Sequence, residues 1–164
     1  MDLTKKLFAS IARGAIALIF IVTGILNWAH FEGVKDYLIS ILKDWSLYMS
    51  GILWAEDLFL SLVDYATPIL ITATAIQIVC GLLIILGWRI QVSAFLILLV
   101  FVPMTIILRH FWFLTGQERD HELILFLKNL SIMGGLLTLM IFGKPEKKPP
   151  PSPPPTQPDD SFPI

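Results

Sequence analysis

Four long apolar segments constrain this chain more than any other feature. They cover approximately Leu7–Ala29, Ala66–Gly87, Ile90–Leu108 and Leu123–Phe142. An α-helix needs about 20 residues to cross the hydrocarbon core of a bilayer, and each segment meets that length. Inside lipid every backbone polar group must be paired within its own segment, so segments of this kind are expected to be helical. The sequence therefore predicts an all-α, polytopic membrane protein whose four transmembrane helices form an antiparallel bundle.

The composition supports lipid as the solvent of this fold. Of the 164 residues 55% are hydrophobic and only 15% are charged, and the mean hydropathy is +0.75. A soluble domain of this size has too much surface for its volume to bury so many apolar side chains. A net charge of -1, with no basic run, gives no sign of a nucleic-acid partner. The single cysteine, Cys80, excludes a disulfide framework, a CxxC pair or a thiolate metal cluster within one chain.

The connections between the segments differ in length. Only Trp88 and Arg89 separate the second and third segments, which predicts an antiparallel helical hairpin. The connection from Arg109 to Glu122 is polar and is expected to be a short loop. An apolar run after Lys5 and Lys6 resembles a signal peptide, but it continues without a small-x-small cleavage site, which favours an uncleaved anchor.

The first connection, residues 30–65, is long for a loop in a small protein. Apolar residues recur at helical spacing in Gly33–Lys43, and Leu47–Val63 is apolar except for the pair Glu56 and Asp57. These patterns predict one or two amphipathic or re-entrant helices at the membrane interface. A fifth spanning helix at 45–65 is disfavoured, because two adjacent acids would lie at its centre.

The C-terminal residues 144–164 differ in composition from the transmembrane domain, residues 1–143. Their proline runs are typical of a disordered, polyproline-type tail, with a groove-binding protein such as an SH3-like or WW-like domain as a possible partner. The distribution of basic residues predicts that both termini are cytoplasmic. The inner side would hold Lys5, Lys6, Arg13, Arg89, Lys144, Lys147 and Lys148, and the outer side Lys35, Lys43, Arg109, Arg119 and Lys128.

Polar and small residues recur along one face of each spanning segment. They predict helix–helix contacts, with a packed bundle as one interpretation and a polar cavity along the same seam as the other. The four stripes are Arg13, Ala17, Phe20, Gly24 and Asn27; Thr74, Gln77, Gly81 and Trp88; Ala94, Leu98, Phe101, Thr105 and Arg109; and Lys128, Ser131, Gly135 and Leu139.

The candidate binding residues are Arg109, His110, Trp112, Lys128 and Asn129. A charge at membrane depth is costly and needs a partner or a water-filled site. Lys128 leans back toward the outer interface, whereas Arg109 leans into the bilayer and needs an acceptor from Gln77, Asn27, Thr105 or an outer acid. We therefore expect these five residues to form one polar, basic outer mouth. The spacing of the three histidines matches no metal motif, so no metal site is predicted, and no catalytic residue is identified.

Taken together, these segments resemble the DoxX family of small four-helix bacterial membrane proteins. The resemblance covers most of residues 7–142 and is carried by Ala12-Arg13-Gly14, Phe20-Ile21-Val22-Thr23-Gly24, Phe31-Glu32-Gly33, Gly81-Leu82-Leu83-Ile84-Ile85-Leu86-Gly87-Trp88-Arg89, Pro103-Met104-Thr105, His110-Phe111-Trp112 and Phe126-Leu127-Lys128-Asn129-Leu130-Ser131-Ile132-Met133-Gly134-Gly135. Three features depart from the family pattern. Gln77 stands where a glutamate is common, the first outer loop is longer, and the proline-rich tail has no counterpart.

The resemblance implies a multi-pass protein of the bacterial cytoplasmic (inner) membrane. Some relatives of this kind are linked to quinone-coupled sulfur oxidation and others to thiol or oxidative-stress complexes. The leading hypothesis is an accessory subunit of a membrane-associated oxidoreductase or stress-response assembly, with other protein subunits as partners. The alternatives are an oxidoreductase subunit that binds quinone as its cofactor, and a small-molecule permease. A shared fold does not by itself transfer any of these activities.

Overall fold

The computed structural model describes residues 3–143, which form six α-helices and one short 3-10 turn. The helices are α1 (Leu3–Ala29), α2 (Phe31–Tyr48), α3 (Leu53–Asp64), α4 (Ala66–Leu86), α5 (Ile90–Leu108) and α6 (Gly116–Phe142), and the turn is η1 (Phe111–Phe113). Four of them, α1, α4, α5 and α6, are long and apolar enough to cross a membrane, whereas α2 and α3 are not. The prediction of an all-α protein with four spanning helices is confirmed.

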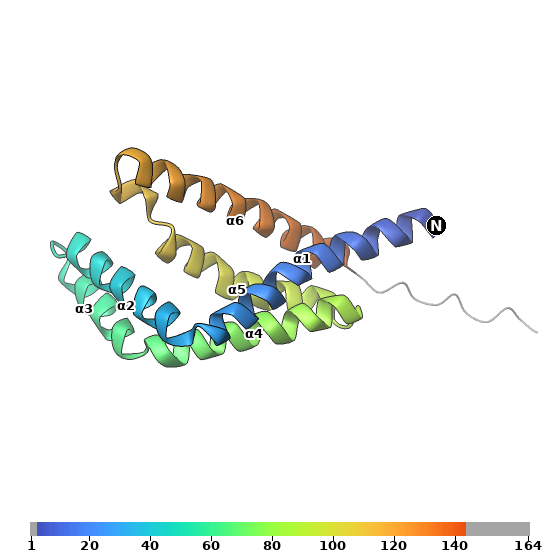
Figure 1. Cartoon of the computed structure of the whole chain (residues 1–164), viewed down its shortest axis with the longest axis horizontal. Coiled ribbons are helices and arrows are strands. Elements are labelled where there is room, and N and C mark those ends of the chain that lie inside the picture. The colour runs from blue at the N-terminus through green and yellow to red at the C-terminus, as the bar shows by residue number, and fades with distance from the viewer. Residues whose placement is uncertain (1–2, 144–164) are drawn as a thin grey trace, which may run out of the picture.

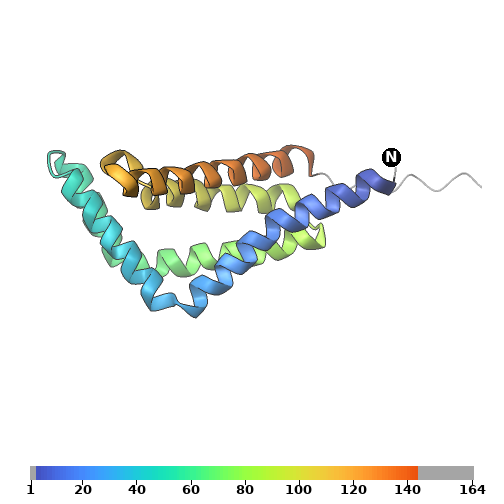
Figure 2. The same cartoon turned by 45° about the horizontal axis from the view of Figure 1, so that its top comes forward.

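The four spanning helices pack in the order α1, α4, α5 and α6. Each packs along its neighbour in that order, but α1 and α6 touch only over a short stretch. They cross where Ile16 lies against Gly135, and toward the α2–α3 hairpin they diverge (Figures 1 and 2). The end of the bundle that carries α2 and α3 is called the hairpin end below. The bundle is therefore closed at one end and splayed at the hairpin end.

The turn between α4 and α5 is set by its backbone. Gly87 adopts a left-handed conformation with a φ of 73°, which a glycine reaches without steric cost. The backbone N–H groups of Gly87 and Trp88 donate to the carbonyl oxygens of Ile84 and Leu83, at 3.2 and 3.0 Å. These bonds satisfy the last carbonyl groups of α4. The predicted antiparallel hairpin of the second and third spanning helices is confirmed.

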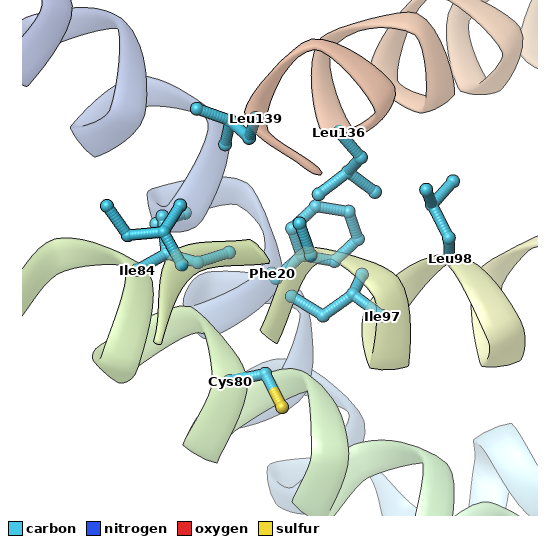
Figure 3. Packing of buried hydrophobic residues seen from close by; sticks show 10 residues of the cluster. Phe20, Cys80, Ile84, Ile97, Leu98, Leu136 and Leu139 are labelled. Carbon is cyan, nitrogen blue, oxygen red and sulfur yellow. The ribbon is translucent and has the colours of Figure 1, made fainter. Parts of the chain in front are cut away.

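The core lies where the spanning helices are closest. Phe20 of α1, Ile84 of α4, Ile97 of α5 and Leu136 of α6 are almost completely buried and pack together (Figure 3). The ring of Phe20 meets the ring of Phe101 edge to face, with 5.3 Å between the ring centroids. This is a favourable arrangement for two aromatic quadrupoles.

Two glycines bring α1 and α4 close together. A Cβ atom on Gly24 would lie 2.6 Å from the side chain of Ile78, and one on Gly81 would lie 2.8 Å from Ile21 and 3.3 Å from the carbonyl oxygen of Ala17. Lipid tails are as apolar as the side chains, so the hydrophobic effect does not drive helices together inside a membrane. Helices that approach this closely are stabilised by van der Waals contact instead. The small residues predicted on these two faces do lie in the interface.

The α2–α3 hairpin packs on the ends of α4 and α5. Leu38 and Leu42 of α2 are buried together with Ala66 and Leu70 of α4. Trp45 donates its indole N–H to the carbonyl oxygen of Ile107 at 2.9 Å and stacks on Phe59 of α3, with 5.2 Å between centroids. The hairpin is therefore attached to the bundle by both packing and a hydrogen bond. The apolar face of α2 is the one that packs on the bundle, as expected for an amphipathic helix.

The third connection differs from the sequence prediction. α6 begins at Gly116, so the second half of the expected loop from Arg109 to Glu122 is helical. Residues 117–122 are polar, so they lie outside the apolar segment from which the helix was predicted. Polar residues can still form a helix. Glu118 in the first turn interacts favourably with the positive end of the helix dipole. The proline-rich segment 144–164 lies outside the described residues.

We predict that Gly81→Val destabilises the bundle by about 1 to 3 kcal/mol, because the new side chain meets Ile21 and the Ala17 carbonyl. Gly134→Val is the matched control, because a Cβ atom there has no neighbour within 4 Å. Thermal unfolding in detergent measures both variants. Equal stability of the two would contradict the close α1–α4 contact.

We also predict that Trp45→Phe loosens the α2–α3 hairpin. The change keeps an aromatic ring but removes the hydrogen bond to Ile107, which contributes about 1 kcal/mol. Amide hydrogen exchange in α2 and α3 should become faster, while exchange in the core of α4 stays unchanged. Trp54→Phe is the control, because Trp54 is 72% exposed, and it should leave the exchange of the hairpin as it is.

Candidate functional site

A cavity of about 460 Å³ lies among the helices near the hairpin end. Its volume is within the range of small-molecule sites. All helices except α3 contribute to its wall, and polar and apolar side chains occur together in it. The polar residues are Thr23, Asn27, His30, Tyr37, Gln77, Thr105, Arg109 and Asn129, and the apolar ones include Leu38, Leu70, Phe101, Met104 and Leu108. A polar lining at membrane depth makes this cavity the candidate site.

Two amide side chains of the cavity differ in their hydrogen bonding. Asn129 of α6 donates to the hydroxyl oxygen of Thr105 of α5 at 3.2 Å. The Oε1 atom of Gln77, in α4, is buried and has no hydrogen-bond partner among the described residues. A buried acceptor without a partner costs about 1 to 3 kcal/mol, so such an atom indicates a water or ligand position. Gln77 therefore offers the cavity a hydrogen-bonding group that the protein itself does not use.

An ion pair borders the cavity at the hairpin end. One terminal guanidinium nitrogen of Arg109 lies 3.1 and 3.3 Å from the two carboxylate oxygens of Glu122. The two side chains are 27% and 17% exposed, so the pair is shielded from water. It joins the end of α5 to the first turns of α6. The acceptor that the sequence analysis required for Arg109 is thus an acid of the third connection.

Tyr37 of α2 lies beside this ion pair. Partial burial raises the pKa of its hydroxyl, the positive charge of Arg109 opposes that shift, and the charge of Glu122 adds to it. The net direction is upward, so Tyr37 keeps its proton at neutral pH. Its hydroxyl can therefore donate a hydrogen bond at the wall of the cavity.

A second, smaller hollow of about 340 Å³ lies on the other side of the ion pair. It is lined by Leu114, Gln117, Glu118, His121 and Glu122. Arg109 borders the inner cavity and Glu122 borders this hollow, so the ion pair links the walls of the two spaces. Among residues 3–143 no group of three His, Cys, Asp or Glu side chains has the arrangement of a metal site.

Two of the five residues selected from the sequence line the cavity, namely Arg109 and Asn129. His110 is 5% exposed and lies in an aromatic cluster instead, with its ring centroid 6.5 Å from that of Trp45 and 6.3 Å from that of Tyr48. Trp112 is 42% exposed and packs on the edges of Trp45 and Phe126. These two residues help to join η1 to the hairpin and are not part of the cavity wall.

Lys128 is exposed on the surface of α6 and does not line the cavity. Ser131, predicted on the same inward stripe, is exposed as well, whereas Asn129 and Leu136 face the bundle. Gly135 and Leu139 of the predicted stripe do lie in helix contacts, so the predicted face is confirmed toward the closed end of α6 and is wrong at Lys128 and Ser131. The single basic mouth expected from the sequence does not form as one site.

The cavity also contains residues that the sequence analysis did not select as binding residues. Asn27, Gln77 and Thr105 belong to the stripes predicted from helical spacing, so that spacing could have identified them as residues of the cavity wall. His30 and Tyr37 join the wall because α2 folds back over the end of α1. Their position depends on a tertiary contact that no local pattern specifies.

Comparison with known proteins gives one family and one curated relative. The DoxX family model matches residues 8–110, which is more than half of the chain. The inner membrane protein YphA of Escherichia coli K12 is 28% identical over 133 residues, which cover 81% of each chain. No solved structure matches. With four spanning helices, a polar cavity at one end and a family match that includes most of the cavity wall, this chain belongs to the DoxX family of membrane proteins.

Proposed function

We propose that this protein is an accessory membrane subunit that holds a quinone headgroup in the cavity at the hairpin end. Its partner would be a membrane-associated oxidoreductase or a stress-response assembly. The observation that carries the proposal is the position of Gln77, Asn129, Tyr37 and Arg109 around one cavity of about 460 Å³.

The chemistry of a quinone matches this wall. Its two carbonyl oxygens accept hydrogen bonds, which Asn129, Tyr37 and the free nitrogens of Arg109 can donate. Its reduced form carries hydroxyl groups, which the unpartnered Oε1 of Gln77 can accept. The ring and its substituents are apolar, and Phe101 and Met104 provide a matching surface. The wall can therefore hold both redox forms of the ligand.

The splayed end of the bundle supports a route of entry from lipid. α1 and α6 both border the cavity but touch only near Ile16 and Gly135. A quinone carries an apolar tail and dissolves in the bilayer, so it would enter sideways between these two helices. This access also agrees with a subunit that presents a bound ligand to a neighbouring protein.

The cellular setting is part of the proposal. YphA is named an inner membrane protein, and we propose the same location for this chain, with both termini in the cytoplasm. The hairpin end then faces the outer side of the membrane, away from Arg89 in the α4–α5 turn. No particular observation favours the permease hypothesis.

We predict that Asn129→Leu and Gln77→Leu each weaken the binding of a short-chain ubiquinone analogue about tenfold or more. Each change removes hydrogen-bonding groups from the wall while keeping a similar volume, and tenfold corresponds to about 1.4 kcal/mol. Quenching of intrinsic tryptophan fluorescence in detergent measures the affinity. Ser131→Ala, on the exposed side of α6, is the control and should bind like the parent protein. Unchanged affinity in both leucine variants would contradict a quinone in this cavity.

A second measurement separates an accessory subunit from an enzyme. The purified protein alone should bind the quinone analogue but neither reduce nor oxidise it with a soluble electron donor or acceptor. Absorbance of the quinone in the ultraviolet follows the reaction. Steady turnover by the isolated chain would disprove the accessory role and leave the binding site in place.

A further inference from the structure

Lys128 lies in the apolar part of α6 without a charged partner among the described side chains. It lies five residues into the apolar part of α6, which begins at Leu123, and it is exposed. At 1.5 Å per residue this is a depth of about 7.5 Å along the helix. The ion pairs between described side chains are Lys35–Glu32 and Arg109–Glu122, so no described carboxylate lies within 4 Å of the Lys128 amine. A cation held in hydrocarbon is costly, and the cost falls when the amine extends to the interface or meets an anion there.

The face of α6 on which Lys128 lies can be identified. Residues seven apart in an α-helix lie on nearly the same face, which places His121, Lys128 and Gly135 in one line. Gly135 meets Ile16 of α1, where the two helices cross. Lys128 is two turns closer to the hairpin end, on the same side. It therefore lies on the side of α6 that meets α1 at Gly135, and beyond that crossing the two helices diverge toward the hairpin end (Figure 2).

We propose that Lys128 binds the phosphate of an anionic phospholipid seated in the gap between α1 and α6. Side chains on a helix lean toward its N-terminus, and for Lys128 that direction is the hairpin end and its membrane surface. A lysine at this depth can extend its amine to the level of the lipid headgroups. The phosphate would supply the negative charge that the described chain does not provide.

The surrounding charges favour this position over the nearby hollow. Glu118 and Glu122 border the hollow at the start of α6, and a phosphate there would meet the carboxylate of Glu118. Glu122 is paired with Arg109, so Glu118 is the carboxylate of the hollow that has no ion-pair partner among the described side chains. A phosphate beside Lys128 would meet a cation instead of this carboxylate. An acid of a partner helix would satisfy the charge equally well, and the experiment must distinguish that occupant.

The test measures lipid retention by native mass spectrometry. The full chain is released from nanodiscs that contain equal amounts of phosphatidylglycerol and phosphatidylcholine with the same acyl chains. The parent protein should retain phosphatidylglycerol in preference. Lys128→Met should reduce that preference about tenfold, and Lys128→Arg should restore it, because a charged hydrogen bond to phosphate is kept. Lys43→Met, an exposed lysine of α2 outside the spanning helices, should leave it unchanged.

Three results would overturn the proposal. They are no preference in the parent protein, the same preference in Lys128→Met, and cross-linking of Lys128 to a carboxylate of another protein in native membranes. Lys128→Gln provides a second neutral variant if the methionine variant does not fold. The phospholipid would occupy the gap through which the quinone is proposed to enter, but Lys128 does not line the cavity. Lipid retention is measured without quinone, so its result does not depend on the outcome for quinone binding.

Discussion

The close contact between α1 and α4 determines the shape of the molecule. Gly24 and Gly81 let the two helices approach until Ile78 and Ile21 fill the space of a missing Cβ atom. This contact keeps α1 on α4 along its length, so α1 cannot also follow α6. The two helices diverge beyond Ile16 and Gly135, and the cavity lies in the space that results. A close contact in one part of the bundle thus produces an open site in another.

The α2–α3 hairpin and the Arg109–Glu122 pair then close the splayed end. α2 covers the cavity with Tyr37 and Leu38, and Trp45 fixes the hairpin to the last turn of α5. The ion pair joins α5 to α6 across the same end. Breaking a shielded pair by removing one partner leaves an uncompensated charge, which is more costly than the net stability the pair provides. Closure at this end therefore depends on polar interactions, whereas the rest of the bundle depends on packing.

Much of the fold could be predicted from the sequence because lipid imposes simple rules on length and backbone pairing. The four spanning helices follow from those rules, the hairpin between the second and third from the two-residue connection Trp88–Arg89, and the one or two helices expected in residues 30–65 from helical spacing. The inward face of α6 near the hairpin end could not be predicted. Lys128 and Ser131 are polar and suggested an inward face, but inward residues such as Leu136 are as apolar as residues that face lipid. Hydropathy has no contrast between core and lipid, so only the tertiary contacts determine which face is buried.

The different positions of Asn129 and Lys128 assign different chemistry to two adjacent residues. Asn129 faces inward and is neutral, so it can contribute to a cavity where an unpaired charge would be too costly. Lys128 faces the gap and is charged, so it suits a position from which the amine reaches the headgroup region. Exchanging the two residues would bury a cation in the cavity and leave an uncharged amide at the gap. One step of 100° along α6 thus separates the hydrogen-bonding wall of the cavity from the charged surface that faces lipid.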